Sequence, residues 1–163
     1  MLKRTLAGLI VAIAMGSSAI AGPLEDANAA YGRGDYAVAL GLFRPLAEQG
    51  NVLAQMRLGD MYLWGRGAPE DYAASAKWYR LAAEQGNTQA QAVLGSSYAD
   101  GIGVPRDYVL AHMWFNLAAT WETIDDLRSF YARRRGELEK QMTPDQIAEA
   151  QHMAREWKPT TAK

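Results

Sequence analysis

A period of 36 residues constrains the fold of this chain more than any other feature. Tyr36, Tyr72 and Tyr108 each follow an aspartate and mark that spacing. Within the period, Ala47-Glu48-Gln49-Gly50-Asn51 returns as Ala83-Glu84-Gln85-Gly86-Asn87. Self-similarity at a fixed period of this size indicates stacked supersecondary units instead of one globular core. The period stops after Trp121.

The units read as pairs of helices. Ala76, Tyr79 and Ala83 lie at helical spacing on one face, Gly86 suits a helix end and Asn87 suits the cap of the next helix. Five repeat helices are therefore expected, at 36–48, 52–64, 72–85, 88–100 and 108–120. The glycine pairs in 65–67 and 101–103 recur with the period after a helix, which indicates inter-helix turns and not a phosphate-binding loop.

Two glycines fall inside predicted helices. Gly59 and Gly95 each follow a leucine of the repeat. A glycine inside a helix costs about 1 kcal/mol relative to alanine. We therefore expect both to lie where a neighbouring helix approaches closely.

The repeated motif resembles a known family. The pattern Ala-x-x-x-Leu-Gly-x-x-Tyr-x-x-Gly-x-Gly-x-Pro-x-Asp-Tyr runs from Ala54 to Tyr72 and again from Ala90 to Tyr108. It resembles the Sel1-like repeat, a relative of the tetratricopeptide repeat, over roughly Tyr36 to Trp121. The resemblance implies an all-α fold, a short right-handed α-solenoid of helix-turn-helix repeats with capping helices at both ends. It also implies a non-enzymatic adaptor that binds a protein or peptide.

These observations divide the chain into segments. A signal peptide is expected at 1–21, the solenoid at 22–158 and a disordered tail at 159–163. Within the solenoid we expect an N-terminal cap at 23–34, repeats at 35–70 and 71–106, a partial repeat at 107–121 and C-terminal capping helices at 123–158.

The first 21 residues have the pattern of a secretory leader. Lys3 and Arg4 precede an apolar run of about ten residues, and Ala19-Ile20-Ala21 matches the small-x-small cleavage rule before Gly22. The alternative is an uncleaved membrane anchor, but a spanning helix needs about 20 apolar residues. The leader predicts a periplasmic or secreted protein with no membrane insertion after cleavage. The resemblance to exported Sel1-like proteins implies a Gram-negative bacterium.

After the period ends, two more helices are expected. Thr123 is the expected cap of the first, whose apolar stripe holds Leu127, Phe130, Tyr131 and Leu138. Thr143-Pro144-Asp145-Gln146 has the pattern of a capping box for the second, which should bury Ile147, Ala150, Met153 or Ala154, and Trp157. Both should cover the open end of the stack.

Composition excludes several kinds of chemistry. The chain has no cysteine, so disulfides, thiol catalysis and thiolate zinc sites are excluded. Its formal net charge of −1 argues against a nucleic-acid binder. His112 and His152 are the two histidines, and although His152 has Glu149 and Glu156 within one turn, a packed or surface role is favoured over a metal site. No catalytic residue, metal or cofactor is predicted.

The candidate binding surface follows from the resemblance. By likeness to tetratricopeptide repeats, the helix with the Leu-Gly pair is placed on the inner, concave surface. The predicted partner-binding residues are Leu53, Met56, Asp60, Leu63, Trp64, Gln89, Ser96 and Asp100, with Ala92 among them. Trp64 has Asp100 as its counterpart one period later, so it is either a binding aromatic or one that packs on the capping helix.

Two other functions stay open at this level. One is a cell-envelope hydrolase or cell-wall-modifying enzyme, for which Asp60 and Asp100 are acid–base candidates without an accompanying nucleophile. The other is a structural subunit that assembles through its own open face or through Arg133, Arg134 and Arg135. The oligomeric state and the identity of the partner do not follow from the sequence.

The leader makes a prediction about the mature protein. Cleavage after Ala21 should leave Gly22 as the N-terminus of protein recovered from the cell envelope. Intact-mass spectrometry of that fraction checks this expectation. A mass that still includes residues 1–21 would contradict export as a processed protein.

Overall fold

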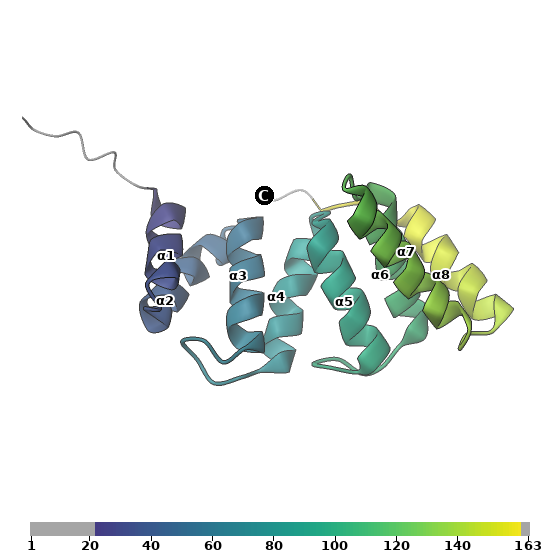
Figure 1. Ribbon diagram of the computed structural model, residues 1–163, viewed down its shortest axis with the longest axis horizontal. Helices are drawn as coiled ribbons and strands as arrows, with labels where there is room; N and C mark the ends of the chain where they lie inside the picture. Colours follow the sequence, from purple (N-terminus) through teal and green to yellow (C-terminus); the bar gives the residue numbers. More distant parts are fainter. Residues whose placement is uncertain (1–21, 161–163) are drawn as a thin grey trace, which may run out of the picture.

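The computed structural model describes residues 22–160, and this part of the chain contains eight α-helices and no strand. The helices are α1 (Pro23–Gly32), α2 (Tyr36–Glu48), α3 (Val52–Leu63), α4 (Tyr72–Glu84), α5 (Thr88–Asp100), α6 (Tyr108–Trp121), α7 (Asp125–Glu139) and α8 (Pro144–Glu156). Figure 1 shows them standing side by side from α1 at one end to α8 at the other. The predicted signal peptide lies outside the described residues.

The architecture is the predicted all-α solenoid of repeated helical units. The five expected repeat helices are present, and their observed ends differ from expectation by one residue at most. Within residues 22–160, no helix has both the length and the apolar character that crossing a membrane requires.

Repeated polar caps explain why the helices begin where they do. At four starts, a side-chain oxygen of the cap residue accepts a hydrogen bond from the backbone N–H three residues later, which satisfies one of the free donors of the first turn. The pairs are Asn51 with Ala54, Asp71 with Ala74, Asn87 with Ala90 and Asp107 with Leu110, at 2.8 to 3.0 Å. The same chemistry thus starts α3, α4, α5 and α6.

The two internal glycines lie at close helix contacts, as predicted. A Cβ atom on Gly59 would lie 2.9 Å from ring carbons of Tyr79, and one on Gly95 would lie 3.0 Å from the ring of Phe115. In both cases the aromatic ring rests on the bare backbone of the neighbouring helix. This joins α3 to α4 and α5 to α6.

The closest packing defines the structural unit. The pairs α3–α4 and α5–α6 share more extensive contacts than α2–α3 or α4–α5. Each unit therefore begins with the helix that contains the Leu-Gly pair, which is α3 or α5. The expected unit began at residue 35, one helix earlier. On this division α1 and α2 form the first pair, and α6 completes a pair in place of opening a partial repeat.

Two apolar clusters share the interior, and α4 belongs to both. Trp78 packs in the cluster that holds Phe43 and Leu58, whereas the next residue, Tyr79, packs in the cluster that holds Leu94 and Phe115. Adjacent residues on a helix point in different directions, so α4 can bury side chains on either side. The core is therefore a line along the stack, as expected for a repeat protein.

The C-terminal segment closes one end of the stack. Both α7 and α8 pack against α6, and the Trp157 ring meets the Trp114 ring edge-on at 6.3 Å. The capping box of Thr143 and Gln146 is present as predicted. The tail was expected to be disordered from 159, but the backbone N–H of Thr160 donates to the carbonyl oxygen of Glu84 at 2.7 Å. Residues 161–163 lie outside the described residues.

The start of α7 differs from expectation because Glu122, and not Thr123, supplies its polar partner. One carboxylate oxygen of Glu122 accepts from the backbone N–H groups of Thr123 and Ile124, at 2.9 and 3.0 Å. The other accepts from the Thr88 hydroxyl at 2.7 Å, which ties the turn to α5. The hydrogen bonds from Ile124, Thr88 and Thr123 hold the pKa of Glu122 below its ordinary value of 4.5.

The expected apolar stripe of α7 is only half correct. Tyr131 and Leu138 are buried against α6, but Leu127 and Phe130 are 39% and 43% exposed. Tyr131 and Leu138 are seven residues apart and share one helical face, and Phe130, directly before Tyr131, lies on the flank of that face. Leu127 shares the face but lies in the first turn of α7. That flank is available to the surface described below.

The glycine contacts predict opposite effects for one substitution at two positions. Gly95→Leu should destabilise the fold by about 1–3 kcal/mol, because the new side chain must displace the Phe115 ring. Gly41→Leu in α2 should be stabilising by about 0.5–1 kcal/mol, because nothing lies within 4 Å of its Cβ position and leucine favours a helix. Urea unfolding of both variants measures the difference. Equal effects at the two positions would contradict the close-contact explanation.

Glu122 predicts a specific dependence of stability on pH. Its pKa is lowered by folding, so its stabilisation is complete above the unfolded pKa and is lost as pH falls through the folded pKa. Glu122→Gln should cost about 1 kcal/mol at pH 7, since a neutral amide replaces a charged acceptor. The wild-type advantage in melting temperature should shrink below pH 4.5. A constant difference from pH 7 to pH 3 would contradict the role of the carboxylate.

Candidate functional site

A hollow of about 220 Å³ lies where α1, α3 and α5 meet. Its lining residues are Asn28 from α1, Leu53, Met56, Arg57 and Asp60 from α3, and Asn87 and Gln89 at the start of α5. Four of the predicted partner-binding residues are thus brought together, namely Leu53, Met56, Asp60 and Gln89.

A second hollow of about 170 Å³ continues along α5 toward α7. It is lined by Gln89, Ala92, Val93 and Ser96 from α5, Phe115 from α6, and Phe130 and Tyr131 from α7. Gln89 lines both hollows, so they form one surface across α1, α3, α5 and α7. We call this surface the α3–α5 face.

Asp60 is held in a defined orientation on this face. Its Oδ1 atom accepts a hydrogen bond of 2.5 Å from the Tyr79 hydroxyl, and its Oδ2 atom lies 3.8 Å from an Arg57 nitrogen. Burial, together with this hydrogen bond to a carboxylate, raises the pKa of Tyr79 well above its ordinary value, so the phenol stays a proton donor. About a third of the Asp60 side chain is exposed, which leaves the carboxylate available to a partner.

The predicted residues on the α3–α5 face differ in exposure. Leu53 is 59% exposed, and Gln89 is also exposed. Met56 is only 8% exposed and Ala92 only 7%, so both form the floor of their hollows and are not freely projecting anchors. Ser96 is half-buried in the second hollow.

Leu63 and Trp64 line a different hollow, so the structure does not bring these two predicted binding residues together with Met56 and Asp60. They line a space of about 430 Å³ at the edge of the stack where the chain turns from α3 to α4 and from α5 to α6. We call this edge the turn edge. The reason is local, since α3 ends at Leu63 and Trp64 is already its C-cap, where the chain leaves the helix. Trp64 is 65% exposed, so the alternative that it packs on the capping helix is also wrong.

Asp100 also lies away from the α3–α5 face. It lines a polar hollow of about 320 Å³ at the other end of α5, beside Arg106, Arg134 and Glu137. Asp100 is exposed and ends α5, where the chain turns at Gly101. Its position as the counterpart of Trp64 explains this placement, because both residues sit at the turn.

The sequence did not point to Phe130 or Asn28 as residues of the face. Phe130 was assigned to a buried stripe, and α7 lies outside the period, so no repeat position indicated its direction. Asn28 lies in α1, which precedes the first Asp-Tyr pair of the period at Asp35-Tyr36. Both were therefore missed for lack of a repeat counterpart.

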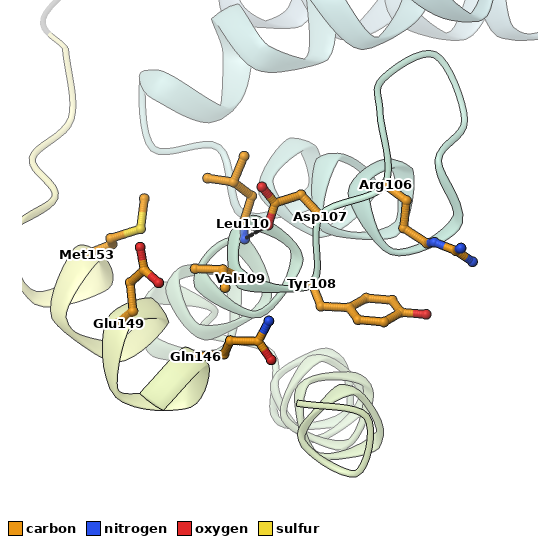
Figure 2. Close-up of a pocket in the computed structure, with 8 residues that line it drawn as sticks. All are labelled: Arg106, Asp107, Tyr108, Val109, Leu110, Gln146, Glu149 and Met153. Atoms are coloured by element: carbon orange, nitrogen blue, oxygen red, sulfur yellow. Dashed lines mark hydrogen bonds between the residues drawn. The ribbon is translucent and has the colours of Figure 1, made fainter. Parts of the chain in front are cut away.

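Another hollow, of about 570 Å³, lies between the start of α6 and α8. Figure 2 shows Glu149 and Met153 from α8 on one side, and Asp107 and Leu110 from α6 on the other. The Asp107 carboxylate already accepts the backbone N–H of Leu110 at 3.0 Å and so serves as a helix cap. Of the two carboxylates that line this hollow, only Glu149 makes no hydrogen bond within residues 22–160. This arrangement lends no support to a hydrolase.

The two histidines occupy different environments. His112 is fully buried, and its Nε2 atom lies 2.9 Å from a Glu139 carboxylate oxygen, which joins α6 to α7. His152 is exposed on α8. Among residues 22–160 no three histidine, cysteine or acidic side chains gather closely enough to hold a metal ion, so the weak site considered at His152 has no structural support.

The arginine run on α7 is occupied by contacts within the chain. Arg133 lies over the Phe130 ring at 5.4 Å, Arg134 pairs with Glu137 at 3.2 Å, and Arg135 donates to Asn116 at 2.7 Å.

Comparison with known proteins places the fold in a class and then in a family. The helix pairs form an α-solenoid, and the family model described as Sel1 repeat matches residues 28–51, 52–87 and 88–120, more than half of the chain. The chain belongs to the Sel1 repeat family. The matched units begin at α3 and α5, in agreement with the closest helix packing. Sel1 repeat proteins generally serve as scaffolds for protein–protein interaction.

The solved structures that are similar to this chain include the following two. One is c5321, a protective antigen of uropathogenic Escherichia coli with an SLR fold, at 36% identity and a TM-score of 0.72. The match covers 83% of this chain but 29% of c5321. The other is a Sel1 repeat protein from Oxalobacter formigenes, at 34% identity and a TM-score of 0.51, over 53% of this chain and 66% of that one. A search of curated proteins gives no match.

Proposed function

We propose that this protein is an exported, non-enzymatic scaffold that holds a protein or peptide partner on the α3–α5 face. The observation that carries the proposal is the pair of connected hollows along four helices, with exposed Leu53 and Phe130 beside polar groups. Apolar anchors supply most of the affinity of such surfaces, and polar groups fix the orientation of the partner.

The size of the hollows favours a polypeptide over a small molecule. They measure about 220 and 170 Å³, whereas sites for small molecules usually enclose about 300–1,000 Å³. Spaces of this size suit single side chains. Two such spaces joined at Gln89 suit consecutive side chains of one bound segment.

The polar groups of the face indicate how a segment would be oriented. The carboxylate of Asp60 accepts hydrogen bonds, the guanidinium of Arg57 donates them, and the Gln89 amide does both. All three line the same hollow as Leu53. A partner backbone or polar side chain would therefore meet fixed donors and acceptors around an apolar centre.

Export is part of the same proposal. The leader pattern of residues 1–21 supports it, and the similar protein c5321 is described as a bacterial protective antigen. We place the scaffold in the periplasm or outside the cell. Because the α3–α5 face consists of two small hollows, we expect it to bind one segment of a partner with modest affinity.

A matched pair of substitutions tests the face. Leu53→Glu should reduce partner affinity at least tenfold, because it places a charge at the apolar centre beside Asp60. Val38→Glu is the control, since Val38 is 56% exposed, close to the 59% of Leu53, and also lies in the first turn of its helix. Partners captured from envelope extract are identified, purified and titrated against wild type and both variants.

Three results are informative. Loss of binding in Leu53→Glu alone supports the α3–α5 face. Equal binding by wild type and both variants would show that another surface holds the partner. Hydrolysis of envelope polymers by the purified wild type would replace the scaffold with the enzyme alternative.

A further inference from the structure

The hollow at the turn edge carries an unusual concentration of exposed apolar side chains. Trp64, Tyr72 and Ile102 are 65%, 44% and 45% exposed, and all three line the same space of about 430 Å³. Leu63 and the glycines of 101–103 complete its apolar wall. We call this space the Trp64 hollow.

The Trp64 hollow contains one charged group, the carboxylate of Glu70. Within residues 22–160, Glu70 forms no ion pair with a lysine or arginine. The nearby Glu70 carboxylate raises the pKa of the Tyr72 phenol. Arg106 follows the same turn, but it lies over the Tyr108 ring and lines other hollows. The hollow therefore presents a negative charge without a cation.

The three repeat tyrosines give an internal comparison. The guanidinium of Arg66 lies 5.5 Å from the ring centre of Tyr36, and that of Arg106 lies 5.8 Å from the ring centre of Tyr108. No arginine of the described residues lies over Tyr72. The middle tyrosine alone lacks its cation.

The repeat explains why that cation is missing. Ile102 occupies the position of Arg66 one period later, and each of the two residues stands between two glycines with positive φ angles. Glu70 occupies the position of Arg106 one period earlier. Neither of the two repeat positions that supply a guanidinium elsewhere does so at Tyr72. One of them holds Ile102, and the other holds Glu70, whose carboxylate can accept hydrogen bonds from a guanidinium.

We propose that the Trp64 hollow binds an arginine side chain of the partner, with the guanidinium against Tyr72 and Trp64 and paired to Glu70. The proposal rests on the scaffold function above and specifies the chemistry of the partner. The incoming arginine takes the place that Arg66 and Arg106 take over the other two repeat tyrosines.

The chemistry favours arginine over lysine. A guanidinium is flat, so it stacks on an aromatic face and donates two parallel hydrogen bonds to a carboxylate. Every cation over a tyrosine in the described residues is an arginine. The apolar wall of Leu63 and Ile102 accommodates the aliphatic part of the side chain.

The test uses acetyl-arginine amide as the probe. The protein is expressed with its own leader, purified from the envelope fraction and titrated by NMR. The indole N–H signal of Trp64, assigned from a Trp64→Phe variant, should shift saturably. Acetyl-citrulline amide, which has the same shape without the charge, should produce a shift at least fivefold smaller, and acetyl-lysine amide an intermediate one.

Two variants separate this hollow from the rest of the surface. Ile102→Arg places an arginine at the position that Arg66 holds in the preceding unit. This arginine should itself occupy the Trp64 hollow, so the probe should no longer shift the Trp64 signal. Val38→Arg adds the same residue at an exposed position on α2 and should leave the response unchanged. Glu70→Gln should weaken probe binding at least threefold.

Each outcome distinguishes this proposal from the scaffold function. Equal shifts with arginine and citrulline probes, or an unchanged response in Ile102→Arg, would overturn the arginine site. Partner binding that depends on Leu53 but not on Ile102→Arg would overturn it as well, while the scaffold function stands. A wild-type dimer that Ile102→Arg converts to a monomer would identify a second copy of the chain as the occupant and overturn an arginine-bearing partner.

Discussion

The contact of an aromatic ring with the bare backbone of a glycine is the constraint on which the rest of the structure depends. At Gly59 the ring belongs to Tyr79, and at Gly95 it belongs to Phe115. The first contact also brings the Tyr79 hydroxyl to Asp60, at 2.5 Å, and so orients a carboxylate on the α3–α5 face. One period later Phe115 has no hydroxyl, and the counterpart of Asp60 is Ser96. The same packing thus supports a hollow with an oriented carboxylate in one unit and a hollow without charged side chains in the next.

Around these contacts, a second set of interactions repeats and fixes the spacing of the stack. The Gln55 amide donates to the Ala47 carbonyl at 3.0 Å, and the Gln91 amide donates to the Ala83 carbonyl at 3.2 Å. Such bonds join the start of one helix to the end of the preceding helix. Both partners are buried, and a buried polar group without a hydrogen bond would destabilise the fold. The units are therefore positioned in part by hydrogen bonds that the period itself encodes.

Features set by local chemistry and by the period could be predicted from the sequence. The caps at Asn51 and Asn87 and the close approach at Gly95 depend on residue type and spacing alone. The placement of Trp64 could not be predicted, because it depends on where α3 ends and which way the chain leaves it. Phe130 was misassigned for a related reason, since α7 follows the last unit and its direction is set by packing on α6. Glu122 was missed because a glutamate that accepts two backbone N–H groups at a helix start matches no common cap pattern.

The positions where the period is broken are where the proposed binding surfaces lie. Residues that repeat, such as Arg44 and Arg80 with their tyrosines, are used for contacts within the chain. Leu53 becomes Gln89 one period later and Asp60 becomes Ser96, and these changes fall on the α3–α5 face. At the turn edge, Ile102 replaces the arginine that covers the preceding tyrosine. A repeat protein needs identical contacts between units to stack, so a side chain that departs from its counterparts without losing the stack is free to contact a partner.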